Sequence, residues 1–238
     1  MKVLVNGCSF SRGPVAWPYY LETIDQSHLI NLACSGAGNT YIFESTVQEI
    51  FQRSYDMVLI MWSGFTRVDL LVEDINHFND SHYTSNYQRT RNDWTEKIIE
   101  PVNDQNFVDP RWVFGCGHIN QEPVLTQSGA FEGIYRYVGV DQFLFHSAIK
   151  IIALQNILKQ NDIPYIFMFY QPFEQQFQKF EYLNNAIDWN NFYLEQNIFT
   201  MAQKNQDLDD TYHPKEKTNR LWAQLVDNQI TKRKIQNA

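Results

Sequence analysis

Residues 56–62 (DMVLIMW) contain an unbroken apolar run, the feature of this chain that most restricts its fold. Such a run is typical of a strand covered on both faces, as in a parallel sheet between helices. Residues 2–5 (KVLV), 28–33 (HLINLA) and 164–170 (PYIFMFY) are further predicted strands. We also predict a last strand at residues 197–202 (NIFTMA).

Helical patterns alternate with these strands. Apolar side chains recur at helical spacing in residues 40–54, in the segment starting at Asp141 and in residues 214–230. Pro18 predicts a further, short helix over 17–24. Alternating strands and helices indicate a three-layer α/β/α sandwich with a parallel sheet of about five strands. We expect one domain over residues 1–238, with an irregular insertion at about 68–140.

The insertion follows the third predicted strand and shows no sustained period, so a stretch of this length is expected to have a role. Its aromatic residues have two interpretations, a wall that stacks on sugars or a local core of the insertion. They are Tyr83, Tyr87, Trp94, Trp112, Tyr135 and Tyr137.

Polar or glycine-rich stretches follow the predicted strands at residues 7–13 (GCSFSRG), 34–39 (CSGAGN) and 63–67 (SGFTR), and another stands at 209–214 (DDTYHP). In a parallel sheet these stretches meet at one edge, outside the carboxyl ends of the strands, where such folds bind ligands. The sequence therefore predicts the functional site at this edge.

Ser9 is a candidate nucleophile, and His213 is the candidate base near the other end of the chain. Asp210, three residues before His213, could hold the imidazole Nδ1–H and leave Nε2 free to take a proton. The backbone N–H groups of Ser9 and Gly36 could stabilise an oxyanion. The alternatives are an ordinary turn at Ser9 and a helix cap at Asp210 and His213.

These stretches together resemble the SGNH (GDSL) hydrolases, and the form seen here is similar to members common in bacteriophage genomes. The first family block is similar to Gly7-Cys8-Ser9 with Gly13, although Cys8 replaces the family's Asp. The second block matches Asn31, Ala33, Ser35 and Gly36, and the last matches Asp210, His213 and Pro214. The resemblance implies a flavodoxin-like sandwich and a serine esterase with a Ser9, His213 and Asp210 triad.

The third block departs from the family pattern. Thr66 and Arg67 follow Gly64 where the family has an Asn, an oxyanion donor, and an Asp. Thr66 or Asn39 could replace that donor. We assign Gly64 and Arg67 to substrate binding, where Arg67 could pair with a substrate carboxylate. The alternative is that Arg67 forms a salt bridge to a neighbour such as Asp69.

Charge and composition limit the partners. The net charge of −8 argues against nucleic acid and anionic membranes. Three cysteines form no disulfide framework, and Cys116 with His118 supplies too few ligands for zinc, so we expect no metal and no cofactor. No signal peptide and no membrane span is visible, which predicts a cytoplasmic protein, or a virion component if it is phage-encoded.

The sequence thus predicts a serine ester hydrolase acting on a small-molecule or carbohydrate O-acyl ester. The alternative is a weak or inactive member of the same fold with a structural or binding role, in contact with virion proteins or as a homo-oligomer. The altered third block favours this alternative, whereas the retained Ser9, Asp210 and His213 favour the enzyme.

Overall fold

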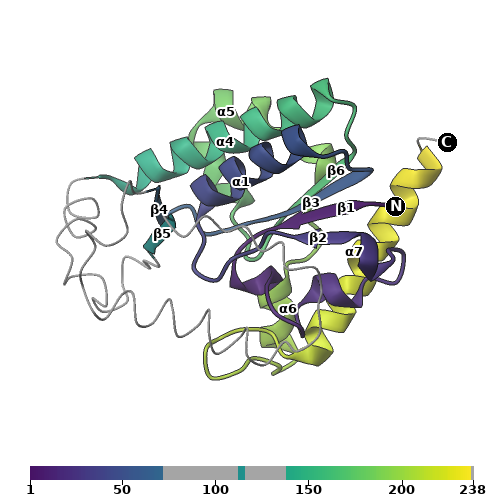
Figure 1. The fold of residues 1–238 in the computed structure, drawn as a ribbon. Coiled ribbons are helices and arrows are strands. Elements are labelled where there is room, and N and C mark those ends of the chain that lie inside the picture. The colour runs from purple at the N-terminus through teal and green to yellow at the C-terminus, as the bar shows by residue number, and fades with distance from the viewer. Residues whose placement is uncertain (72–111, 116–137, 237–238) are drawn as a thin grey trace.

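The computed structural model describes residues 1–71, 112–115 and 138–236. Its centre is a parallel five-stranded sheet of order β2-β1-β3-β6-β7 (Figure 1). The strands are β1 (Val3–Asn6), β2 (Leu29–Asn31), β3 (Met57–Trp62), β6 (Tyr165–Phe169) and β7 (Phe192–Tyr193). This confirms the predicted parallel sheet, and residues on both sides of the insertion contribute to it.

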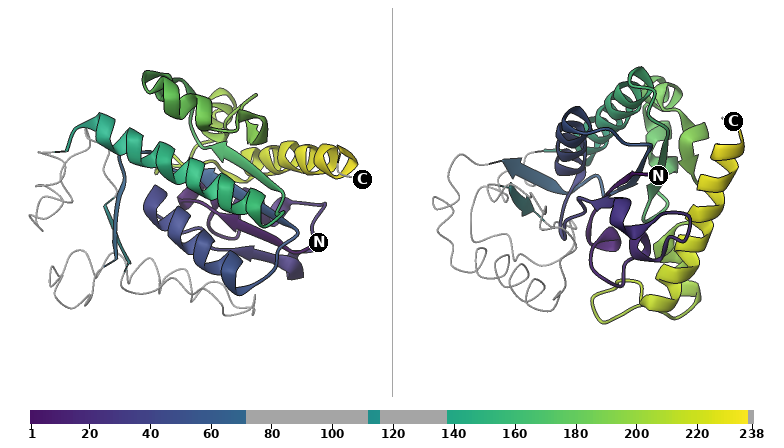
Figure 2. Two further views of the ribbon diagram at one scale, coloured as in Figure 1. Left: turned by 90° about the horizontal axis from the view of Figure 1, so that it is seen from above. Right: turned by 45° about the vertical axis from the view of Figure 1, so that its right-hand side comes forward.

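Helices cover both faces of the sheet (Figures 1 and 2). The long helices α1 and α4 lie side by side on one face, and α6 and α7 lie on the other. The α-helices are α1 (Asn39–Gln52), α4 (Val140–Gln160), α5 (Glu181–Ala186), α6 (Ile198–Lys204) and α7 (Glu216–Gln236). The fold is therefore the three-layer α/β/α sandwich that the alternating pattern predicts.

Short 3-10 helices form many of the connections between these elements. The predicted helix over 17–24 is one of them, and it is shorter than predicted. They are η1 (Ser9–Ser11), η2 (Trp17–Tyr20), η3 (Gln26–His28), η6 (Glu174–Lys179) and η7 (Trp189–Asn191).

The core has two layers, one on each side of the sheet. In β3, Val58, Ile60 and Trp62 belong to the layer under α1 and α4. The alternate residues of the same strand belong to the layer under α6 and α7. Every residue of β3 is buried, which explains the unbroken apolar run in its sequence.

The segment predicted as the last strand is instead helix α6 (Ile198–Lys204). The Asn197 side chain accepts a hydrogen bond from the Thr200 N–H at 2.9 Å and caps the first turn. Ile198 and Ala202, four residues apart, are both buried, so a helix places them on one face. The fifth strand is the two-residue β7.

The insertion begins with β4 (Val68–Leu71), which pairs antiparallel with β5 (Trp112–Gly115) in a separate two-stranded sheet. The remainder of the predicted insertion up to residue 137 lies outside the described residues. The proposed aromatic wall at Tyr83, Tyr87, Trp94, Tyr135 and Tyr137 falls in this part, as do Cys116 and His118.

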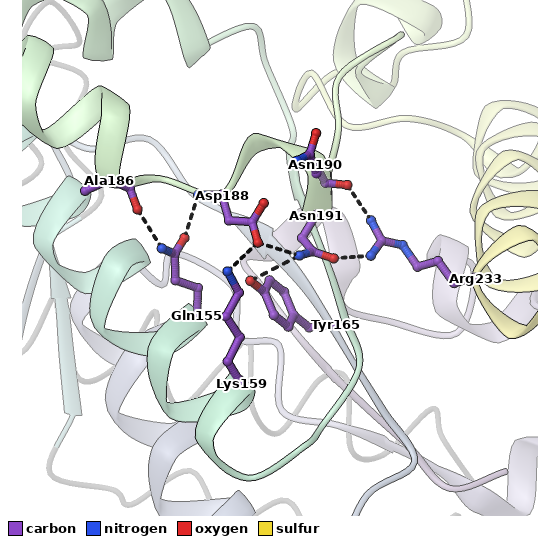
Figure 3. A network of polar contacts seen from close by, with 8 residues as sticks. All are labelled: Gln155, Lys159, Tyr165, Ala186, Asp188, Asn190, Asn191 and Arg233. Carbon is purple, nitrogen blue, oxygen red and sulfur yellow. Dashed lines mark hydrogen bonds and ion pairs between the residues drawn. The ribbon is translucent and has the colours of Figure 1, made fainter. Parts of the chain in front are cut away.

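A polar network ties α4 and α7 together near the start of β6 (Figure 3). Lys159 of α4 forms an ion pair with Asp188 at 2.5 Å, and Asp188 accepts a hydrogen bond from Asn191 at 2.8 Å. Asn191 also contacts the hydroxyl of Tyr165 at 3.4 Å and accepts from Arg233 of α7. Since Tyr165 is the first residue of β6, this network lies at the amino-terminal edge, away from the predicted site.

Candidate active site

Ser9 and His213 are in direct contact, although 204 positions separate them in the chain. The imidazole Nε2 of His213 lies 2.6 Å from the Ser9 hydroxyl oxygen. Ser9 opens η1 just after β1 ends, and His213 lies in the loop that leads into α7. The structure therefore brings the candidate nucleophile and the candidate base together at the carboxyl edge of the sheet.

The other imidazole nitrogen of His213 contacts Thr211, not Asp210. Nδ1 lies 2.9 Å from the Thr211 hydroxyl oxygen, and that hydroxyl lies 2.7 Å from Asp209 Oδ1. Asp210 is exposed, and within the described residues no hydrogen bond involves its side chain. The predicted hydrogen bond from His213 Nδ1 to Asp210 is therefore replaced in the structure by a contact with Thr211.

Backbone geometry explains why Asp209, and not Asp210, contacts Thr211. Asp209 Oδ1 also accepts hydrogen bonds from the N–H of Thr211 at 2.8 Å and the N–H of His213 at 2.9 Å. The Asp209 N–H in turn donates to the His213 carbonyl, and Tyr212 adopts a left-handed φ of 61°. This tight turn directs the Asp209 carboxylate toward Thr211 and the backbone of His213, whereas the Asp210 side chain points into solvent.

The pKa values at the site favour a neutral base beside an ionised carboxylate. Burial lowers the pKa of His213, Asp209 opposes this, and the positive charge of Arg67 lowers it further. Burial raises the pKa of Asp209, but the hydrogen bonds from His213 and Thr211 outweigh it and leave that pKa below its ordinary value. A neutral imidazole can accept a proton from Ser9.

Aromatic side chains pack around the imidazole. Phe10, the residue after Ser9, has its ring centroid 4.9 Å from that of His213 and 4.6 Å from that of Tyr170. Both Phe10 and Tyr170 are buried, and the Arg67 guanidinium lies over the Tyr170 ring at 5.8 Å. Tyr170 directly follows β6, and its position after a buried strand is the signal by which the sequence could have pointed to it.

The backbone N–H groups of Ser9 and Gly36 are the predicted oxyanion donors. Neither the Ser9 nor the Gly36 N–H donates to another residue in the described parts of the chain. Gly36 has a left-handed φ of 82°, which glycine adopts without strain. Its loop is held beside the Ser9 loop by the hydrogen bond from the Cys34 N–H to the Gly7 carbonyl at 3.2 Å.

Asn39 is not available as an oxyanion donor. Its side-chain Nδ2 donates to the Ser63 carbonyl at 3.2 Å and to the Ser147 hydroxyl of α4 at 3.0 Å. Its Oδ1 accepts the Ser63 N–H at 2.9 Å. Because every polar group of this buried amide already has a partner, Asn39 joins α1 to α4 and to the loop after β3, and its amide is not free to bind an oxyanion.

Gly64, Thr66 and Arg67 lie in the loop after β3, where the Arg67 N–H closes a turn onto the Gly64 carbonyl. A side chain at Gly64 would begin 3.3 Å from the Tyr170 hydroxyl. Arg67 also donates to the Ala37 carbonyl at 3.2 Å, so it links the second and third loops of the site. Roles for Gly64 and Arg67 in substrate binding, and for Thr66 as a donor, stay predictions.

Asp69, the neighbour considered as a salt-bridge partner of Arg67, has another structural role. Its carboxylate accepts the Gly38 N–H at 2.7 Å and the Tyr41 N–H at 2.9 Å at the start of α1. Arg67 also acts on it electrostatically, which opposes the rise in its pKa caused by burial. Asp69 therefore fastens β4 to α1.

Other chemistries have less support at this edge. Cys8 and Cys34 are both fully buried free cysteines, so Cys8 packs in the core beneath Ser9. Among the described residues, no three His, Cys, Asp or Glu side chains gather as a metal site.

None of the described helices is both long and apolar enough to cross a membrane.

No family model and no curated protein matches this chain, so its geometry and its sequence motifs are the basis for inferring a function.

Proposed function

We propose that the protein is a serine ester hydrolase of the SGNH type. The observation that supports this most strongly is the 2.6 Å contact between Ser9 Oγ and His213 Nε2. A hydroxyl becomes a useful nucleophile when a neutral base within hydrogen-bond distance can take its proton during attack. The open N–H groups of Ser9 and Gly36 lie in the two adjoining loops, where they could bind the developing oxyanion.

The reaction follows from these positions. Ser9 Oγ attacks the ester carbonyl carbon while its proton passes to His213 Nε2. The tetrahedral intermediate collapses, the bond to the alcohol oxygen breaks, and His213 returns the proton to the departing alcohol. His213 then takes a proton from a water molecule, whose oxygen attacks the acyl-Ser9 carbonyl carbon. The bond to Ser9 Oγ breaks, His213 returns the proton to Oγ, and the carboxylic acid leaves.

We propose the O-acyl ester of a carbohydrate as the substrate class. Aromatic and polar residues of the insertion suit a sugar better than a long acyl chain. The insertion begins at β4, directly after the loop that carries Thr66 and Arg67.

A fluorophosphonate probe tests acylation at Ser9 directly. We expect labelling of the wild-type protein at Ser9, located by mass spectrometry, and no labelling of Ser9→Ala. His213→Ala should lower the labelling rate by a factor on the order of 10²–10⁴, the usual contribution of a general base. Ser35→Ala changes an exposed serine of the neighbouring loop and serves as the matched control, with an unchanged rate.

The alternative, an inactive protein with a structural or virion role, makes the opposite prediction. It draws its support from Thr66, which stands in place of the family's oxyanion donor. Folded wild-type protein that stays unlabelled at neutral pH would favour it, as would equal labelling of the wild type and His213→Ala.

A further inference from the structure

We propose that Thr211, held by Asp209, fixes His213 in the tautomer that can accept the proton of Ser9, and that Asp209 is the acidic residue of this site. The inference deepens the proposed function and rests on it. Both residues act through His213, so they are positioning residues. The catalytic roles remain with Ser9 and His213.

Hydrogen-bond capacity determines the direction of each bond in this chain of groups. An ionised carboxylate only accepts hydrogen bonds, so the Thr211 hydroxyl must donate its single hydrogen to Asp209 across the 2.7 Å contact. The Thr211 oxygen can then only accept at its 2.9 Å contact with His213. Nδ1 must therefore carry the imidazole hydrogen, which leaves Nε2 bare and facing Ser9 at 2.6 Å.

The surroundings keep Asp209 in the ionised form that this argument needs. Its Oδ1 accepts from two backbone N–H groups as well as from Thr211, and these contacts stabilise the charged carboxylate. The same contacts close the turn, together with the bridge between Leu208 and Pro214. Asp209 therefore both shapes the turn and orients the Thr211 hydroxyl.

The hydrogen-bonded chain from Asp209 through Thr211 to His213, called the relay below, also acts during the reaction. When His213 takes the proton of Ser9, it becomes an imidazolium whose Nδ1–H donates to an oxygen polarised by Asp209. Among the described residues, the charged groups that act on this imidazole are Asp209, which favours the cation, and Arg67, which disfavours it. Asp209 and Thr211 are both exposed, so water competes with this contact and limits its effect on the rate.

Substitution of Thr211 tests the relay with little change in shape. Thr211→Val keeps the volume and the backbone contacts but removes the hydroxyl, and we expect labelling of Ser9 to slow by roughly tenfold to a hundredfold. Thr211→Ser restores the hydroxyl and should recover most of that loss. Asp210→Asn is the matched control on the adjacent residue and should label at the wild-type rate.

Nitrogen-15 NMR of the His213 ring supplies a readout that does not depend on activity. We expect the Nδ1–H tautomer in the wild type and in Asp210→Asn, and a mixture of the two neutral tautomers in Thr211→Val. Asp209→Asn should also give a mixture, because an amide can donate to the Thr211 oxygen. Circular dichroism shows whether each variant is folded.

Two results would overturn the proposal. One is a Thr211→Val variant that keeps the wild-type rate and tautomer, and the other is an Asp210→Asn variant that slows as much as Thr211→Val. Failure of the proposed function looks different: the wild type would be unlabelled, while the NMR spectra would still report whether Thr211 selects the tautomer.

Discussion

His213 determines how the reactivity of Ser9 should depend on pH. Burial lowers the pKa of this imidazole below its ordinary value of 6.5, and Arg67 contributes in the same direction. In the proposed mechanism His213 accepts the Ser9 proton only when it is neutral, so we expect full reactivity above this lowered pKa and a loss of reactivity as the pH falls through it.

We expect the rate of fluorophosphonate labelling, measured between about pH 5 and 8, to have its midpoint below 6.5. Arg67→Met removes the nearby positive charge and should move the midpoint upward. Arg220→Met is the control, since Arg220 lies on the exposed face of α7 paired with Glu216. A wild-type midpoint above 6.5 would contradict this account of the imidazole environment.

Among the secondary-structure elements, α1 depends on a residue from the insertion. Asp69 of β4 is buried and accepts two N–H groups from the first turn of α1 and its cap. Gly38 permits this approach, because a side chain there would begin 2.9 Å from Asp69 Oδ1. Burial raises the pKa of Asp69 to about 6, despite the opposing effect of these hydrogen bonds and of Arg67.

We expect the free energy of unfolding contributed by Asp69 to fall as the pH rises from about 4 to above 6. In this window the folded protein holds a proton on Asp69, whereas the unfolded chain, with a pKa near 3.8, does not. Relative to Asp69→Asn, the wild type should lose at most about 3 kcal/mol across the window. Urea unfolding of both proteins measures the difference.

Asp162→Asn, an exposed carboxyl beyond the end of α4, is the control and should show the pH dependence of the wild type. If Asp69→Asn also keeps the pH dependence of the wild type, Asp69 is ionised in the folded state over the whole range.

Over the whole molecule, the two ends of the chain are fastened to each other. Asp227 of α7 accepts hydrogen bonds from the N–H of Glu22 at 2.7 Å and of Thr23 at 3.2 Å. Asn219 of the same helix accepts from the N–H of Trp17 at 3.1 Å. Because Ser9 lies shortly before Trp17 in the chain and His213 shortly precedes α7, this fastening helps to hold Ser9 and His213 in contact.

We expect Asp227→Ala to lower the free energy of unfolding by about 2 kcal/mol, because it leaves partly buried N–H groups of the 22–23 segment without an acceptor. Asn228→Ala changes the exposed neighbour on the same helix and should have little effect. Equal midpoints of urea unfolding for the two variants would show that the end-to-end contact contributes nothing measurable.

The architecture could be predicted from the sequence because it depends on burial patterns that are local. The apolar runs of β1, β3 and β6 and the helical spacing of α1, α4 and α7 each indicate their element without distant contacts. The strand predicted at the segment that forms α6 is wrong, because a short apolar run fits a strand or a helix equally well. The Asn197 cap and the packing of Ile198 and Ala202 decide for the helix.

The pairing of Ser9 with His213 could also be anticipated, since both follow or adjoin elements that converge at one edge of a parallel sheet. The partners of His213 could not. Spacing along the chain does not specify which of two adjacent carboxylates lies beside the imidazole, and here the turn from Asp209 to His213 selects Asp209 through Thr211. Likewise, the sequence predicts Asn39 as a possible oxyanion donor, but in the fold its amide donates to Ser147, more than 100 residues away. The side-chain partners of a site are long-range contacts, and only the packed chain brings them within hydrogen-bond distance.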